Sequence, residues 1–183
     1  MNYANNDPTL IQERLAWKDK IYNYNRLRPS DLLYRKTILL EILGKTGGNF
    51  IIEQPFYCDY GYNISIGENF YSNFNLVILD EASVTFGDNV FIAPNVGIYT
   101  ASHPLDAAAR NLGQETANPV MIGSNVWIGA GVQILPGVSI GDNSVIGAGS
   151  IVNKSIPANV LAVGNPCRVV REIAPKIPKE EAP

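Results

Sequence analysis

The chain has 183 residues, of which 46% are hydrophobic and 17% charged, and its formal net charge is −3. That length suits one domain with small additions, and the composition argues against a disordered chain. The negative charge argues against a nucleic-acid-binding protein, and no apolar run is long enough for a membrane span or a secretory signal.

The cysteine and histidine content limits the kinds of site that the chain can form. Cys58 and Cys167 form no CxxC motif, so a disulfide framework or a zinc site is not expected, and we expect a cytoplasmic protein. The chain contains a single histidine, His103. This excludes any site that needs two or three histidines from one chain.

The first segment, residues 1–50, is predicted to be helical. Residues 8–25 read as a helix with Asp7 as its N-cap and Pro8 at its first position. Its expected apolar stripe consists of Leu10, Ile11, Leu15, Ile21 and Tyr22. A second helix is predicted over residues 31–43, beginning near Ser30 and closed by Gly44.

Residues 51–173 carry a six-residue repeat. An aliphatic residue recurs at Ile122, Ile128, Ile134, Ile140, Ile146 and Val152, and the same phase is found earlier at Ile66, Phe86 and Ile92. Asn or Gly stands three residues later, at Asn69, Asn89, Asn95, Asn125, Gly131, Gly137, Asn143 and Gly149. Among the nine hexads only Ser155 departs from this rule.

The repeat has a simple physical reading. Asn and Gly accept a left-handed backbone conformation at low cost, so the pattern predicts a tight corner in every hexad. Pro94-Asn95 and Pro136-Gly137 are typical of the central positions of type II turns. Three short strands then close a triangular coil of about 18 residues, with the aliphatic residue inside. The predicted fold is an all-β parallel β-helix.

Two segments depart from the repeat. The hexad lapses over residues 104–118, which predicts a loop extruded from one corner. Residues 174–183 are rich in proline and charge and are expected to form a flexible tail.

Polar residues gather at three irregular points of the repeat. His103 stands where the regular coil gives way to the extruded loop. Asn73 and Asn75 occupy phases where a regular hexad would have apolar or small residues, and Asp59 and Glu81 add carboxylates near corners. These are the candidate functional residues.

Residues 56–173 resemble the maltose and galactoside O-acetyltransferases of the hexapeptide acyltransferase superfamily. The segments that carry this resemblance are CDYGYN at 58–63, NFYSNFN at 69–75, GDNVFIAPNV at 87–96, YTASHP at 99–104, NVWIGA at 125–130, PGVSIGDNSVIGAGSIV at 136–152 and GNPCRVVREI at 164–173. The N-terminal NDPTLIQERL also resembles that family. The resemblance implies a left-handed coil and a homotrimer with active sites between subunits.

The resemblance implies transfer of an acetyl group from acetyl-coenzyme A to a hydroxyl group of a sugar, with no metal. A hydroxyl group needs a general base, and His103 is the candidate. Asn73 would hold the acceptor hydroxyl, and the backbone N–H near Ala130 would stabilise the oxyanion. The implied acceptor-binding residues are Asn5, Arg14, Asp59, Tyr71 and Glu81.

This sequence departs from the galactoside type at three acceptor positions. Asn5 and Glu81 stand where galactoside-type members have aspartate, and Asp59 matches the maltose type rather than the galactoside serine. The roles of the acceptor-binding residues therefore follow less directly from the resemblance than the roles of the other site residues.

The coenzyme site follows from the same resemblance. Ala130 and Ala148 are small residues that let the backbone approach a pantetheine arm. Arg168 and Arg171 match the family's phosphate contacts, for which the guanidinium fork is well suited. The full set of implied coenzyme-binding residues is Trp127, Ala130, Ala148, Asn153, Lys154, Arg168 and Arg171.

Other readings remain open at this point. The acceptor could be a non-sugar hydroxyl or an amino sugar, and a β-helix can also be a non-catalytic scaffold. A carbonic anhydrase of the γ type, which shares the prism, needs three histidines and is disfavoured by the single His103. Neither Cys58 nor Cys167 matches a family nucleophile.

Overall fold

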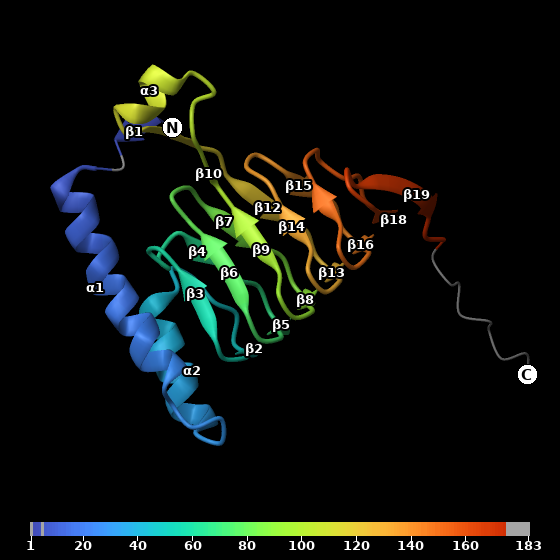
Figure 1. Cartoon of the computed structure of the whole chain (residues 1–183). Coiled ribbons are helices and arrows are strands. Elements are labelled where there is room, and N and C mark those ends of the chain that lie inside the picture. The colour runs from blue at the N-terminus through green and yellow to red at the C-terminus, as the bar shows by residue number, and fades with distance from the viewer. Residues whose placement is uncertain (1, 5, 175–183) are drawn as a thin grey trace, which may run out of the picture.

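The computed structural model of the chain describes residues 2–4 and 6–174. Successive short strands coil into a triangular prism, so that each face is a parallel sheet with one strand from each coil (Figure 1). The two N-terminal helices lie at the end of the prism where the coil begins, and β18 and β19 lie at the other end.

The three faces differ in length. The seven-stranded sheet contains β2 (Phe50–Ile52), β5 (Phe70–Ser72), β8 (Phe91–Ile92), β13 (Trp127–Ile128), β16 (Val145–Ile146), β18 (Val160–Val163) and β19 (Arg168–Glu172). The five-stranded sheet contains β3 (Phe56–Cys58), β6 (Leu76–Leu79), β9 (Gly97–Tyr99), β14 (Gln133–Ile134) and β17 (Ile151–Val152). The four-stranded sheet contains β4 (Ile64–Ser65), β7 (Val84–Phe86), β12 (Val120–Ile122) and β15 (Ser139–Ile140). The pairs are parallel except β18 with β19, which is antiparallel.

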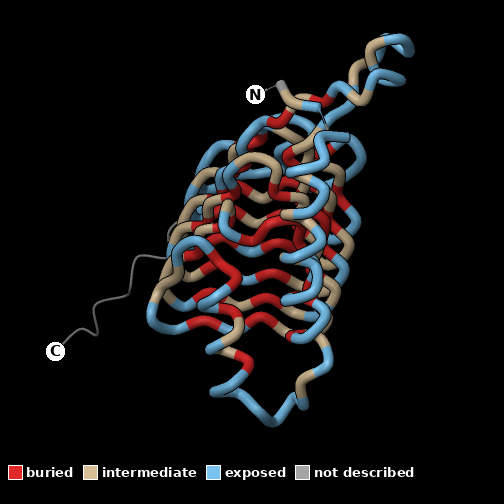
Figure 2. Tube along the Cα trace, turned by 90° about the vertical axis from the view of Figure 1, so that its left-hand side faces the viewer, coloured by how far each residue is buried: buried red, intermediate tan, exposed pale blue. Residues whose placement is uncertain are grey.

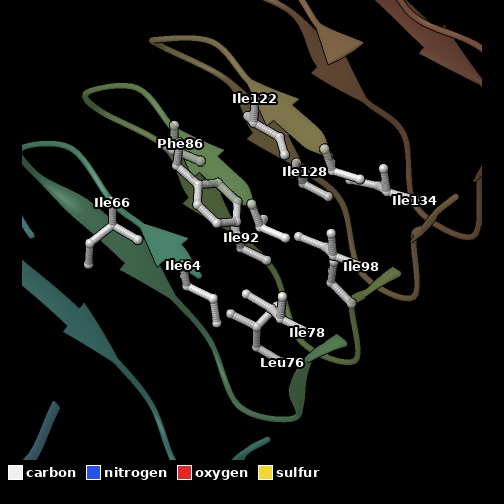
Figure 3. Close-up of a cluster of buried hydrophobic side chains, with 14 of the residues drawn as sticks. Ile64, Ile66, Leu76, Ile78, Phe86, Ile92, Ile98, Ile122, Ile128 and Ile134 are labelled. Atoms are coloured by element: carbon white, nitrogen blue, oxygen red, sulfur yellow. The ribbon is translucent and has the colours of Figure 1, made fainter. Parts of the chain in front are cut away.

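The core is the inside of the prism. The buried segments of successive coils stack above one another along its whole length (Figure 2). Ile66, Phe86, Ile92, Ile122, Ile128 and Ile134 point into this interior from different sheets (Figure 3). The six aliphatic positions predicted from Ile122 onward are each at most 3% exposed, which confirms the hexad interpretation.

The predicted corners are confirmed as well. All eight Asn and Gly residues named for the corners have a positive φ, between 56° and 79°. Asn75, with φ 60°, is a further corner of the same kind, so its unusual phase has a structural reason.

Each of the three edges of the prism has its own chemistry. The edge from the four- to the seven-stranded sheet, here called the asparagine edge, is held by amide side chains, each donating to the next at 2.8–3.1 Å. This ladder runs through Asn49, Asn69, Asn89, Asn125, Asn143 and Asn159. The ladder therefore stabilises this edge along the length of the prism.

The N-terminal helices are α1 (Pro8–Asn25) and α2 (Leu32–Ile42). Asp7 caps α1 as predicted, accepting from the N–H of Thr9 at 2.8 Å. The predicted apolar stripe is wrong at Ile11, Leu15 and Tyr22, which are 39%, 59% and 56% exposed. Helix α1 instead buries Ile21 and Tyr24, near its C-terminal end, where it packs on β3.

The bounds predicted for the second helix are also corrected. Asp31, rather than Ser30, is the N-cap of α2, and the helix ends at an extended Leu43. Gly44 has no left-handed conformation; a Cβ there would lie 2.0 Å from the carbonyl oxygen of Tyr62. This glycine allows the chain to approach the first coil closely.

Arg35 of α2 fastens the helices to the prism. It is 4% exposed and pairs with Glu53 at 2.9 Å, while also donating to the carbonyl of Ile52 at 2.9 Å. Tyr24 of α1 donates to the same carbonyl. The start of the coil is thus tied to both helices.

The extruded segment is more ordered than the predicted loop. It contains α3 (Ala107–Asn111) and β11 (Gln114–Ala117), and β11 pairs with both β10 (Ala101–Ser102), which precedes the segment, and the N-terminal β1 (Asn2–Ala4). Figure 1 shows this small sheet and α3 standing off from the prism beside the start of α1. The predicted tail lies outside the described residues from 175 onward. No helix of the described part of the chain is long and apolar enough to cross a membrane.

Candidate functional site

The edge from the five- to the four-stranded sheet carries a column of polar residues, and we call it the histidine edge. Asp59 follows β3, Glu81 follows β6 one coil further on, and His103 follows the β9–β10 segment in the coil after that. Because parallel strands end at the same edge of a sheet, these residues stack on one side of the prism. The structure therefore brings together three of the residues singled out in the sequence.

His103 faces a buried carboxylate. Its Nε2 lies 3.5 Å from Oε1 of Glu115, whose side chain is only 9% exposed, whereas the imidazole is 56% exposed. The sequence interpretation missed Glu115. A signal was present, because Asp106 and Glu115 are the only acidic residues in the lapse of the repeat that begins beside His103.

Asp59 and Glu81 form a pair of carboxyl groups. A hydrogen bond joins them, and Asp59 also pairs with Lys18 of α1 at 2.9 Å. Burial, together with Asp59, raises the pKa of Glu81 to about 7. The neighbouring Asp80 is fully buried and accepts three backbone N–H groups at 2.7–3.0 Å, so its role is to fix this corner.

A recess of about 230 Å³ opens beside this pair. It is lined by Tyr3, Leu10, Tyr60, Tyr62, Asn63 and Glu81. Arg14 of α1 reaches the same region, donating to the hydroxyl of Tyr60 at 3.4 Å. Aromatic rings next to a carboxyl group and amides suit a ligand with apolar C–H faces and many hydroxyl groups.

Asn73 lies on a different edge, the one from the seven- to the five-stranded sheet. Ala130 and Ala148 follow it along that edge, which we call the small-residue edge. A Cβ added at Gly131 or Gly149 would meet no atom within 4 Å, so the edge is bare there. A single chain does not bring Asn73 to His103.

The other predicted coenzyme residues are divided between the edges and the C-terminal strand. Asn153 and Lys154 lie at the far end of the histidine edge, and Arg168 of β19 lies beside them, with its Nη1 3.5 Å from Oδ1 of Asn153. Arg171 is on the same strand, and Trp127, 56% exposed, lies on the outer face of the seven-stranded sheet.

Of the remaining predicted site residues, Tyr71 lies on β5, paired with Phe91 of β8, and Asn5 lies outside the described residues. Cys58 and Cys167 are buried free thiols, and burial raises the pKa of both. Among the described residues, no group of three or more His, Cys, Asp or Glu side chains is arranged to hold a metal ion.

Comparison with known proteins gives two family-model matches. Residues 1–47 match the maltose acetyltransferase hexapeptide capping motif, and residues 119–154 match the bacterial transferase hexapeptide (six repeats). The galactoside O-acetyltransferase of Escherichia coli K12 is 52% identical over 164 residues, which are 90% of this chain and 81% of that protein.

Solved structures match over nearly the whole chain. A galactoside acetyltransferase in complex with coenzyme A aligns with a TM-score of 0.91 and 49% identity, over 94% of this chain and 86% of that one. A maltose O-acetyltransferase from Clostridium difficile 630 aligns with a TM-score of 0.93 and 50% identity, over 95% and 93%. The match confirms the left-handed β-helix. The chain therefore belongs to the maltose and galactoside O-acetyltransferase family of hexapeptide-repeat acyltransferases and is an acetyltransferase.

Proposed function

We propose that this protein transfers the acetyl group of acetyl-coenzyme A to a hydroxyl group of a sugar, with His103 as the general base. The observation that carries the proposal is the pairing of His103 with the buried Glu115, on the same edge as an aromatic and acidic recess. Its relatives include a galactoside O-acetyltransferase and a maltose O-acetyltransferase.

The pairing prepares the imidazole to accept a proton. Glu115 faces Nε2 and favours the tautomer that carries its proton there, which leaves Nδ1 as the basic nitrogen. The carboxylate also stabilises the imidazolium that forms when Nδ1 takes the proton of the acceptor hydroxyl. This is the arrangement of a general base with an orienting acid.

The reaction then proceeds by direct transfer. As the acceptor oxygen loses its proton to His103, it attacks the thioester carbonyl, and the developing oxyanion accepts from the backbone N–H near Ala130. Collapse of the tetrahedral intermediate breaks the C–S bond, and the imidazolium returns the proton to the departing thiolate. The products are an acetyl ester and coenzyme A, and no covalent acyl-enzyme forms.

The recess beside Glu81 is our candidate for the acceptor. Tyr60 and Tyr62 offer ring faces to the C–H surface of a sugar, and Glu81, Asp59 and Arg14 offer charged partners for its hydroxyl groups. In its protonated form the Asp59–Glu81 pair can both donate and accept, which suits hydroxyl groups better than a fixed carboxylate does.

The small-residue edge is our candidate for the pantetheine arm. Ala130 and Ala148 flank the two bare glycine corners, so an extended chain can lie close to the backbone there. Lys154, Arg168 and Arg171, at the C-terminal end of the prism, are candidates for the phosphate groups. Trp127 and Asn153 complete the proposed coenzyme surface.

The protein is proposed to act as a homotrimer in the cytoplasm. His103 and Asn73 lie on different edges of one chain, so a site that uses both needs His103 from one subunit and Asn73 from its neighbour. Large apolar residues on the outer face of the seven-stranded sheet, which follow one another in register, also favour assembly: Ile51, Tyr71, Phe91 and Trp127.

Coenzyme A release measured against a panel of acceptors tests the proposal. The panel holds maltose, glucose, a β-galactoside, an amino sugar and a non-sugar alcohol. Release stimulated by one of the first three, with the acetyl ester found by mass spectrometry, supports sugar O-acetylation. Release stimulated only by the amino sugar or the non-sugar alcohol would show that the acceptor is not a sugar hydroxyl group. Failure to bind acetyl-coenzyme A would overturn the proposal.

A further inference from the structure

Tyr3 lies directly opposite Glu115 in the small sheet above the prism. Strands β1 and β11 pair in antiparallel register, with Tyr3 and Glu115 as partners. The hydroxyl of Tyr3 donates a hydrogen bond to Oε2 of Glu115. The N-terminal strand thus contacts the acid that faces His103, although 112 residues separate Tyr3 from Glu115.

The two oxygens of Glu115 have different partners. Oε2 accepts from Tyr3, and Oε1 lies 3.5 Å from Nε2 of His103. The Glu115 side chain is 9% exposed, so water gives little competition for these contacts. A carboxylate held at one oxygen by a fixed donor has its other oxygen fixed as well.

The surroundings of Tyr3 favour its protonated hydroxyl, which is the form that donates a hydrogen bond to Glu115. Burial, the hydrogen bond to Glu115 and the charges of Glu81, Glu115 and Tyr60 all raise the pKa of Tyr3. His103, just after β10, and Tyr3 of β1 both lie against the Glu115 carboxylate, and Glu81 faces Tyr3 from the prism.

We propose that Tyr3 is a positioning residue for the base, acting through Glu115 to hold the imidazole of His103 in its working orientation. This rests on the proposed role of His103. The Tyr3 hydroxyl fixes the carboxylate and shares its negative charge, and the carboxylate in turn fixes the proton on Nε2. The N-terminal strand is thereby part of the transferase site.

The single histidine makes a direct test possible, because the imidazole nitrogen signals in an NMR spectrum of the protein belong to His103 alone. The variants are Tyr3→Phe, Glu115→Gln, the double variant, and Tyr34→Phe as a control. Tyr34 is an exposed tyrosine of α2 with no part in the proposed site.

The two nitrogen signals report which nitrogen of the imidazole carries the proton. Glu115→Gln removes the carboxylate that favours the proton on Nε2, so the neutral imidazole gains a larger share of the Nδ1–H tautomer. Tyr3→Phe releases one oxygen of that carboxylate, so the tautomer mixture shifts in the same direction by a smaller amount. In the double variant the mixture matches that of Glu115→Gln, and Tyr34→Phe leaves it unchanged.

Kinetics supply the second readout. Tyr3→Phe should lower kcat about 3- to 10-fold, with KM for acetyl-coenzyme A within about twofold, and should add no loss in the Glu115→Gln background. An unchanged tautomer mixture in Tyr3→Phe, or an equal effect of Tyr3→Phe with and without Glu115, would overturn the proposal. The tautomer measurement needs no turnover, so it remains decisive even if the chain acetylates none of the acceptors tried.

Discussion

Asp59 and Glu81 follow neighbouring strands of the five-stranded sheet, and their carboxyl groups share a hydrogen bond. A bond between two carboxyl groups needs one proton, and burial with Asp59 nearby raises the pKa of Glu81 to about 7. The Nζ atom of Lys18 lies 2.9 Å from Oδ1 of Asp59, and the raised pKa belongs to Glu81. The shared proton is therefore assigned to Glu81. The candidate acceptor recess therefore gains a negative charge near neutral pH.

This pair predicts a pH-dependent stability. Between the ordinary Glu pKa of 4.5 and about 7, the folded chain binds more protons than the unfolded chain, so the free energy of unfolding falls as pH rises. Glu81→Gln cannot ionise and escapes this loss. The difference in unfolding free energy between Glu81→Gln and the unaltered protein should therefore favour the variant more at pH 8 than at pH 5. The change in this difference should be on the order of 1 kcal/mol, since Glu81 is partly exposed.

Urea unfolding at the two pH values, at one fixed protein concentration, measures this difference. Glu41→Gln, at an exposed position of α2, is the matched control and should show no such dependence. If the Glu81→Gln difference is the same at pH 5 and pH 8, Glu81 does not titrate in this range.

Arg168 and Arg171 should contribute to coenzyme affinity and not to acceptor affinity. Replacing both by alanine removes two cations from the C-terminal end of the prism, and we expect Kd for acetyl-coenzyme A to rise about 10- to 100-fold. Calorimetry measures this, with Arg28→Ala, an exposed arginine after α1, as control. Unchanged coenzyme affinity would remove both arginines from the phosphate site.

Mixed assemblies should recover activity from two inactive variants. If each site takes His103 from one subunit and Asn73 from the next, a trimer that mixes His103→Ala and Asn73→Ala chains contains one intact site. Refolding the two variants together in equal amounts should restore about a quarter of the native turnover. Mixtures that stay as inactive as either variant alone would contradict a shared site.

The asparagine edge should tolerate glycine better than alanine. Asn125 has φ 58°, accepts from Asn89 and donates to Asn143, both at 3.1 Å. Asn125→Ala loses both bonds and forces alanine into the left-handed region, which should cost about 2–3 kcal/mol of unfolding free energy. Asn125→Gly loses the bonds alone and should cost about 1 kcal/mol less. Urea midpoints compare the two, and equal losses would mean that backbone strain is not what selects the corner residue.

The sequence predicted the prism well because its determinants are local. Each hexad determines its own corner and its own inward side chain. Examples are the positive φ of Asn69 and Gly131 and the buried Ile128, and the neighbouring coils have the same local structure. The helices were predicted less well, because the prism decides which face of α1 is covered, and it covers Ile21 and Tyr24 while leaving Leu15 exposed.

The candidate site could be predicted only in part for the same reason. His103 was marked by its place at the end of the regular coil. Its partner Glu115 depends on the pairing of β10, β11 and β1, which joins segments more than a hundred residues apart. No periodic pattern encodes such a contact, so the sequence marks Glu115 only as one of two acidic residues in the lapse beside His103 and gives no signal for Tyr3.

The most direct test of the proposed chemistry is the turnover of His103→Ala with acetyl-coenzyme A and the best acceptor of the panel. A general base at this position predicts a variant that stays folded, binds acetyl-coenzyme A with native affinity and loses roughly 10²- to 10⁴-fold in kcat. Turnover within a few-fold of the native protein would show that His103 is not the base.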